Sequence, residues 1–156
     1  HEVSLISANS VIRYLDKKKY EVLACAIDLK GQWLLQDPKK FELGEGKALK
    51  IQKKGKPVTL VAGKRPQLVG IGGSRVKVAF DVVFPVMHGP LCEDGSIQGW
   101  LELCGAPYVG CAVLSSAMSR DKALAKQVVR AAGVPVGPSL VLKDRTWRQE
   151  LGAARV

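Results

Sequence analysis

The chain has 156 residues, 47% of them hydrophobic and 24% charged, which predicts one compact globular domain rather than a disordered chain. No stretch is apolar for long enough to span a membrane as a helix, so an integral membrane protein is excluded. The formal net charge of +10 raises the question of nucleic-acid binding. Much of this charge comes from one segment, because residues 37–65 contain nine Lys and Arg but only three Asp and Glu. That basic segment has Phe41 as its only aromatic residue and no recognisable motif, so a nucleic-acid interface is not expected.

The four cysteines form no CxxC pair, and we expect no secretory signal. His88 together with Cys92, Cys104 and Cys111 would supply the donors of a zinc site, but the spacing matches no standard zinc module. We therefore expect buried free thiols, no metal site and a cytoplasmic protein. The chain begins at His1, directly before a helix start, and we expect that it has been cut at its front.

The beginning of the chain predicts a helix and then a β-hairpin. Ser4 is a helix-capping residue, and the apolar residues that follow recur at helical spacing as far as Leu15. Residues 21–27 have the composition of a buried strand, and Asp28-Leu29-Lys30-Gly31 predicts a turn into a second strand over 32–35.

The basic segment predicts a β-hairpin insert over residues 36–77, in which 48–52 pair with 58–62. Residues 78–87 are then almost all apolar, which is typical of a strand covered on both faces in a parallel sheet. Pro85 has no N–H to donate to a neighbouring strand, so we expect a sheet edge or a bulge at that point.

Further elements alternate between helix and strand. Acidic residues and Ser96 favour a helix start after residue 93, and Gly105 with Pro107 predicts its end. A brief strand is expected over 108–111. Ser119 is expected to cap a helix that continues through Ala132, and residues 139–142 predict a last strand before a helix-forming stretch over 145–154.

This alternation predicts an α/β domain with a mainly parallel sheet. Ligands of such sheets bind at the carboxyl ends of the strands. His88 follows the most apolar strand, so we expect it beside the crevice of the domain, next to the helix that starts near Asp94. The pattern by itself identifies no reaction.

Three runs of residues resemble one enzyme family. HEVSL at residues 1–5 is similar to the second half of the N-terminal signature of D-alanine–D-alanine ligases, which are ATP-grasp enzymes. FPVMHGPLCEDGSIQG at 84–99 resembles their histidine loop, and LELCGAPYVG at 101–110 continues in register. The pair Asp121-Lys122 resembles an Asp-Lys pair that follows in the family. The order of these motifs makes the histidine loop a specific signal.

The resemblance implies an activity and its cofactors. ATP, with Mg²⁺, phosphorylates the carboxylate of one D-alanine, and the amine of a second D-alanine attacks the acyl phosphate to give the peptidoglycan dipeptide. Positive and hydrogen-bonding groups are needed to stabilise both the phosphoryl transfer and the tetrahedral intermediate. The resemblance also implies a homodimer.

The same resemblance assigns roles to four residues. His88 is similar to the family histidine beside the first D-alanine and its acyl phosphate, where imidazole donates a hydrogen bond; the alternative is a loop histidine that caps a strand end. Glu93 is expected to orient His88 in the substrate site, or else to compensate a helix dipole. Val3 is expected to flank the D-alanine methyl group, or to pack at the helix entry. Lys122 resembles the lysine that reaches the ATP phosphates, with a solvated lysine as the alternative.

The sequence also departs from the family. The glycine-rich first strand, which ends in the glutamate that grips the D-alanine ammonium, is absent, so the sheet is expected to lack a central member. Cys92 stands where glycine is usual, and Arg120 stands where methionine is usual. The magnesium-binding carboxylates are expected beyond Val156, so the chain alone is expected to be inactive.

These inferences predict a three-layer, Rossmann-like pre-ATP-grasp domain over residues 1–134 that lacks its first strand and carries the basic hairpin insert. Residues 135–156 are expected to begin the central ATP-grasp domain. One alternative is a stand-alone module that binds a small ligand without catalysis. Another is a basic nucleic-acid-binding protein, whose affinity would fall steeply with salt.

Overall fold

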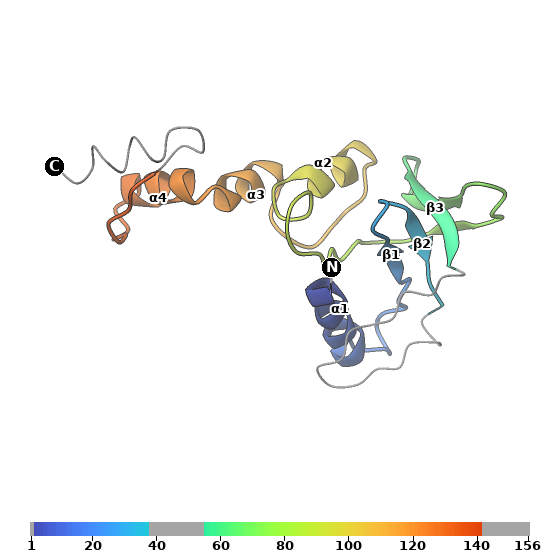
Figure 1. The fold of residues 1–156 in the computed structure, drawn as a ribbon. Coiled ribbons are helices and arrows are strands. Elements are labelled where there is room, and N and C mark those ends of the chain that lie inside the picture. The colour runs from blue at the N-terminus through green and yellow to red at the C-terminus, as the bar shows by residue number, and fades with distance from the viewer. Residues whose placement is uncertain (1, 38–54, 142–156) are drawn as a thin grey trace. The chain divides into compact units, whose positions relative to one another are not determined.

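The computed structural model describes residues 2–37 and 55–141, and the chain divides into two compact units, His1–Ala117 and Met118–Val156 (Figure 1). Each unit is described by itself. No helix in the described part of the chain is long and apolar enough to cross a membrane.

Helix α1, Glu2–Tyr14, opens the first unit, as the apolar spacing predicts. Ser4 is not its cap but lies inside the first turn, because the helix begins three residues earlier than expected. Asp16 ends the helix: its carboxylate accepts a hydrogen bond from the Lys18 backbone N–H at 2.9 Å, which competes with continued helix.

A five-stranded antiparallel sheet follows, with the strands in sequence order (Figure 1). Its members are β1 (Cys25–Ile27), β2 (Trp33–Leu35), β3 (Lys56–Val61), β4 (Gln67–Gly70) and β5 (Lys77–Ala79). The hairpin of β1 and β2 confirms the sequence prediction. Asp28 organises its turn, because one carboxylate oxygen accepts from the backbone N–H groups of Lys30 at 2.8 Å and Gln32 at 2.9 Å.

The prediction of a mainly parallel sheet is not confirmed, since all four strand pairings are antiparallel. The predicted strand over 78–87 shortens to β5, and Val82 and Phe84 are 48% and 53% exposed. The apolar run is therefore not covered on both faces. One isolated parallel bridge joins Val83 to Tyr108, with Val83 N–H donating to Pro107 O at 2.8 Å. Pro85, two residues later, lies outside every strand.

The basic insert is only partly described. The predicted partner segment 48–52 lies outside the described residues, whereas β3 pairs with β2 on one side and β4 on the other. β3 and β4 form the hairpin with Val58 opposite Gly70 and Val61 opposite Gln67.

The core of the first unit joins the sheet to one helix. Val58, Leu60 and Leu68 from β3 and β4 cluster with Leu101 and Cys104 from the region of helix α2, Ser96–Leu103. Leu101 is fully buried. The helix ends as predicted at Gly105, whose φ of +64° is the left-handed conformation that favours glycine. Core packing therefore fixes α2, and with it the loop that precedes it.

Two helices, α3 (Val113–Arg120) and α4 (Lys122–Ala131), replace the single helix expected from Ser119. Ser119 lies within α3, and Asp121 is the cap of α4, accepting from the backbone N–H groups of Ala123 at 2.9 Å and Leu124 at 3.0 Å. An aspartate at this position satisfies two of the orphan donors of a helix start. Helix α4 ends before Gly133, as predicted.

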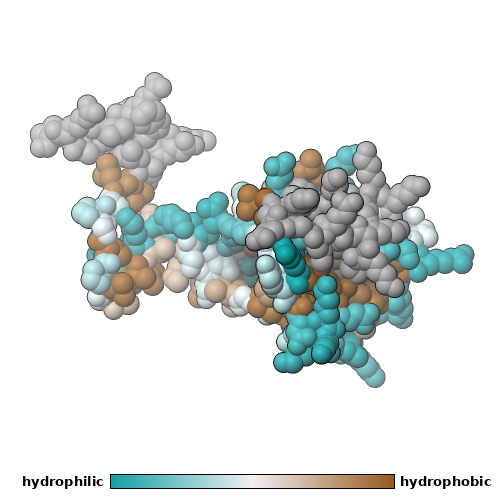
Figure 2. Space-filling view, turned by 90° about the horizontal axis from the view of Figure 1, so that it is seen from below, coloured by the Kyte–Doolittle hydropathy of each residue, from teal (hydrophilic) through white to brown (hydrophobic). Residues whose placement is uncertain are grey.

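The apolar face predicted to point inward on α4 is exposed in the described part of the second unit. Leu124, Val128 and Val129 are 42%, 39% and 38% exposed, and apolar side chains reach the surface of this unit, at the left of Figure 2. Residues 139–141 form no strand, while Leu142 and the helix expected over 145–154 lie outside the described residues.

Candidate functional site

Two serines of α1 hold His88. The His88 backbone N–H donates to Ser4 Oγ at 3.0 Å, and Ser7 Oγ lies 2.9 Å from His88 Nε2. Residues three apart on a helix lie on the same face, so one turn of α1 contacts both the backbone and the imidazole. These contacts join segments 84 and 81 positions apart in the sequence. The position and the orientation of His88 are thus fixed together.

Glu93 lies on the other side of the imidazole, with Oε1 3.5 Å from His88 Nδ1. The distance is long for a hydrogen bond but close enough for electrostatic orientation. If Nδ1 carries the proton, as the nearby Glu93 carboxylate favours, Nε2 of the neutral ring accepts from the Ser7 hydroxyl. The side chains of His88 and Glu93 are 47% and 43% exposed, so a ligand can reach the imidazole from solvent.

The loop between His88 and α2 is shaped by Asp94. Its carboxylate accepts from the backbone N–H of Leu91 at 2.7 Å and from that of Ser96 at 3.0 Å. Leu91 has a φ of +66°, an uncommon conformation for a residue with a side chain, and the bond to Asp94 offsets this strain. A carboxylate side chain therefore fixes the loop that carries Glu93.

Gly95 is required in this loop for two reasons. Its φ is +92°, and a Cβ there would lie only 2.8 Å from the backbone oxygen of Val113 at the start of α3. Cys92, in contrast, is not in the left-handed region, so the cysteine at a position where the family usually has glycine needs no special backbone freedom.

Two cysteines have a shifted thiol pKa, and both shifts are upward, which disfavours the nucleophilic thiolate. Burial, followed by the charges of Asp94 and Glu93, raises the pKa of the Cys92 thiol. Burial raises the pKa of Cys25 to about 11. Cys104 is buried as expected, whereas Cys111 is exposed, so the expectation of buried thiols is wrong for that residue. Within the described ranges, no three His, Cys, Asp or Glu side chains gather as metal ligands.

Val3 lies one turn before Ser7 on α1, and therefore on the same face as the serine that contacts His88. Val3 is 60% exposed. Lys122 is the exposed first residue of α4. It belongs to the second unit, whereas Val3, His88 and Glu93 belong to the first.

Ser4 and Ser7 were missed by the sequence analysis as site residues. Their signal is the spacing of three on a helix that begins with a family motif, but nothing in the sequence says which distant loop they contact.

Ser7→Ala is expected to change the tautomer of His88. Loss of the hydroxyl removes the donor to Nε2, so the neutral imidazole shifts from the Nδ1–H form toward the Nε2–H form. Side-chain ¹⁵N chemical shifts of the chain measure the two populations directly. Ser10→Ala is the matched control, because the Ser10 hydroxyl donates to Ile6 O of its own helix at 3.2 Å. Equal spectra for wild type and Ser7→Ala would contradict the assigned contact.

Asp94→Asn is expected to make the free energy of unfolding depend less on pH in the acid range. Hydrogen bonds from Ser96 and then from the Leu91 backbone hold the pKa of Asp94 below its ordinary value. A lowered carboxyl pKa stabilises the fold above about pH 4, and this contribution is lost as the pH falls through the folded-state pKa. Urea unfolding at several pH values should show a steeper acid loss for wild type than for the variant. Parallel profiles would show that Asp94 is not linked to folding.

Comparison with known proteins indicates the family in which the cluster of Ser4, Ser7, His88 and Glu93 occurs. The family described as "D-ala D-ala ligase N-terminus" matches residues 1–111, which include α1, His88 and Glu93. The chain belongs to this family. It is 45% identical over 153 residues to D-alanine–D-alanine ligase A of Bradyrhizobium diazoefficiens, covering 96% of this chain and 41% of that protein. It is 43% identical to the D-alanine–D-alanine ligase of Mycolicibacterium vanbaalenii, and the match covers 93% of this chain and 41% of that protein. The chain thus spans about two fifths of the length of these ligases.

Solved ligase structures are similar as well. The D-alanine–D-alanine ligase of Coxiella burnetii superposes with a TM-score of 0.74 at 31% identity, covering 98% of this chain and 45% of that one. A D-Ala:D-Ser ligase of Enterococcus faecalis superposes with a TM-score of 0.71 at 30% sequence identity, covering 99% of this chain and 44% of that one. The family resemblance predicted from the histidine loop is therefore confirmed, and the α/β class with it.

Proposed function

We propose that this chain is the D-alanine-binding part of an ATP-dependent D-alanine–D-alanine ligase. The observation that carries the proposal is the arrangement of His88 between the Ser7 hydroxyl and the Glu93 carboxylate, within the part of the chain that matches the ligase family. A half-exposed imidazole held from both sides suits a group that must meet an anionic substrate repeatedly in one orientation.

His88 is the proposed catalytic residue. Protonated, its Nε2–H can donate to a carboxylate oxygen of D-alanine and then to the acyl phosphate, in place of Ser7 Oγ. Glu93, 3.5 Å from Nδ1, keeps the ring in its orientation. The exposed Val3 side chain would border the methyl group of the same D-alanine.

ATP and Mg²⁺ are the proposed cofactors of the longer enzyme. When bound, ATP supplies the phosphoryl group that activates the D-alanine carboxylate. Lys122 is a fitting contact for its phosphates, because it is an exposed cation. The described residues contain no cluster of His, Cys, Asp or Glu suited to a metal, so no step is assigned to Mg²⁺ in this chain.

We also propose that the longer protein completes a parallel sheet around the Val83–Tyr108 bridge. Exposed Val82 and Phe84 beside that bridge are suited to burial by a neighbouring strand or helix. Residues 1–134 would then be the pre-ATP-grasp domain, and 135–156 the start of the central domain, in a cytoplasmic homodimer as the resemblance implies.

A chimera tests the proposed function. The residues of this chain replace the aligned residues of the Bradyrhizobium ligase, which supplies everything outside the 153-residue match. D-Alanine-dependent phosphate release from ATP is expected, with little release on L-alanine. A folded chimera that releases no phosphate with D-alanine would overturn the proposal. If the chain alone then retained D-alanine without any effect of ATP, a non-catalytic binding module would be favoured.

A further inference from the structure

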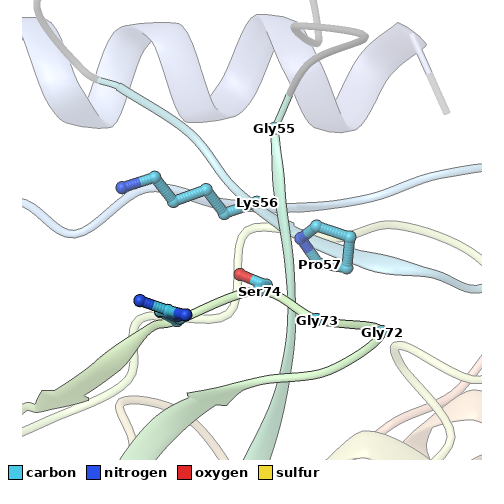
Figure 3. Close-up of a pocket in the computed structure, with 7 residues that line it drawn as sticks. Gly55, Lys56, Pro57, Gly72, Gly73 and Ser74 are labelled. Carbon is cyan, nitrogen blue, oxygen red and sulfur yellow. The ribbon is translucent and has the colours of Figure 1, made fainter.

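A basic pocket that shares no residue with the His88 cluster lies between the start of β3 and the turn from β4 to β5 (Figure 3). Its volume is about 470 Å³. It is lined by Gly55, Lys56, Pro57, Gly72, Gly73, Ser74 and Arg75. Two of these residues carry a positive charge and none carries a negative one, so the lining favours an anion.

The Ser74 hydroxyl lacks a partner. Its Oγ is buried and makes no hydrogen bond to any described residue, although a buried hydroxyl without a partner is costly. Figure 3 shows this oxygen and the Lys56 side chain extending to the same side of the turn. A hydroxyl donor beside a cation is a pairing that an oxyanion satisfies.

The turn itself offers two further donors. Gly72 and Gly73 have φ values of +60° and +84°, and their backbone N–H groups have no partner among the described residues. Successive N–H groups in such a turn form a concave anion-binding surface. The turn is closed by Gly70 N–H donating to Val76 O at 2.8 Å, and a Cβ at Gly70 would lie 1.9 Å from the Ser74 carbonyl oxygen. Ser74 is therefore held against the strand by tight packing.

We propose that this pocket binds the phosphate group of a small anion. The ligand accepts from the turn N–H groups and, after rotation of the Ser74 side chain about χ1, from the Ser74 hydroxyl, and Lys56 and Arg75 neutralise its charge. A nucleic-acid backbone is the less suitable source of phosphate, because no aromatic side chain lines the pocket to stack a base. The site shares no residue with the His88 cluster, so it stands or falls apart from the proposed ligase function.

Titration of the ¹⁵N-labelled chain with inorganic phosphate tests the proposal, with chloride at equal ionic strength as the reference. Saturable shifts are expected for the backbone signals of Gly72, Gly73 and Ser74. The double variant Lys56→Gln with Arg75→Gln should weaken phosphate binding by about tenfold or more, since it removes two charge-assisted contacts. The spectra themselves report whether each variant is folded.

The matched control is Lys30→Gln with Lys64→Gln, which removes the same charge from exposed turns outside the pocket. Unchanged phosphate affinity in this control supports a local site. Equal weakening in both double variants, or shifts spread over the whole surface, would show diffuse attraction and overturn the proposal. A single-stranded oligonucleotide that binds more tightly than phosphate, with shifts outside the pocket, would likewise overturn it.

Discussion

Leu101→Ala is expected to lower the free energy of unfolding of the chain by about 2 to 5 kcal/mol. Leu101 is fully buried in α2, in the cluster that includes Val58, Leu60 and Leu68 of the sheet. Truncation removes apolar contacts and leaves a cavity, because the sheet behind the helix cannot close over it. Urea unfolding followed by tryptophan fluorescence measures the loss.

Leu103→Ala is the matched control on the same helix. The Leu103 side chain is 82% exposed, so its truncation is expected to change the free energy of unfolding by no more than about 0.5 kcal/mol. Similar losses for the two variants would contradict the packing of α2 against β3 and β4.

His88→Ala is expected to lower the D-alanine-dependent turnover of the chimera by about 10² to 10³-fold. In the proposed function the substitution removes a donor to the developing charge, while the contacts that hold the loop through Asp94 remain. Ser7→Ala should cause a smaller loss, because the imidazole is still present and Glu93 still orients it. Steady-state kinetics with D-alanine as the varied substrate give both values.

Lys30→Ala is the control for these kinetics, because Lys30 is exposed in the turn between β1 and β2. Its turnover should equal that of the unsubstituted chimera. If His88→Ala were as active as this control, the imidazole would have no part in the reaction, and the histidine would only close the end of the loop.

Local signals in the sequence predicted the elements that depend on neighbouring residues. The turn at Asp28 to Gly31 and the end of α2 at Gly105 were predicted correctly, because each depends on a side chain or backbone conformation within a few positions. Helix α4 was predicted with Ser119 as its cap instead of Asp121, since both are suitable caps and the sequence does not rank them, and α3 was not predicted.

Long-range pairing could not be predicted in the same way. An apolar run such as 78–87 indicates burial, but it does not say which strand lies beside it or in which direction. The same distinction between local and long-range signals applies to the candidate site. The motif identified His88 and Glu93, whereas the contacts of Ser4 and Ser7 with His88 depend on how α1 meets a loop about eighty positions away.

The most direct test of the central claim is whether D-alanine reaches His88. The imidazole signals of His88 in the isotope-labelled chimera, identified by their loss in His88→Ala, are followed as D-alanine is added with ADP and Mg²⁺ present. The proposed site predicts that D-alanine shifts these signals and that L-alanine leaves them in place. Signals that stay unmoved at D-alanine concentrations that saturate turnover would contradict the assignment of His88 to the substrate site.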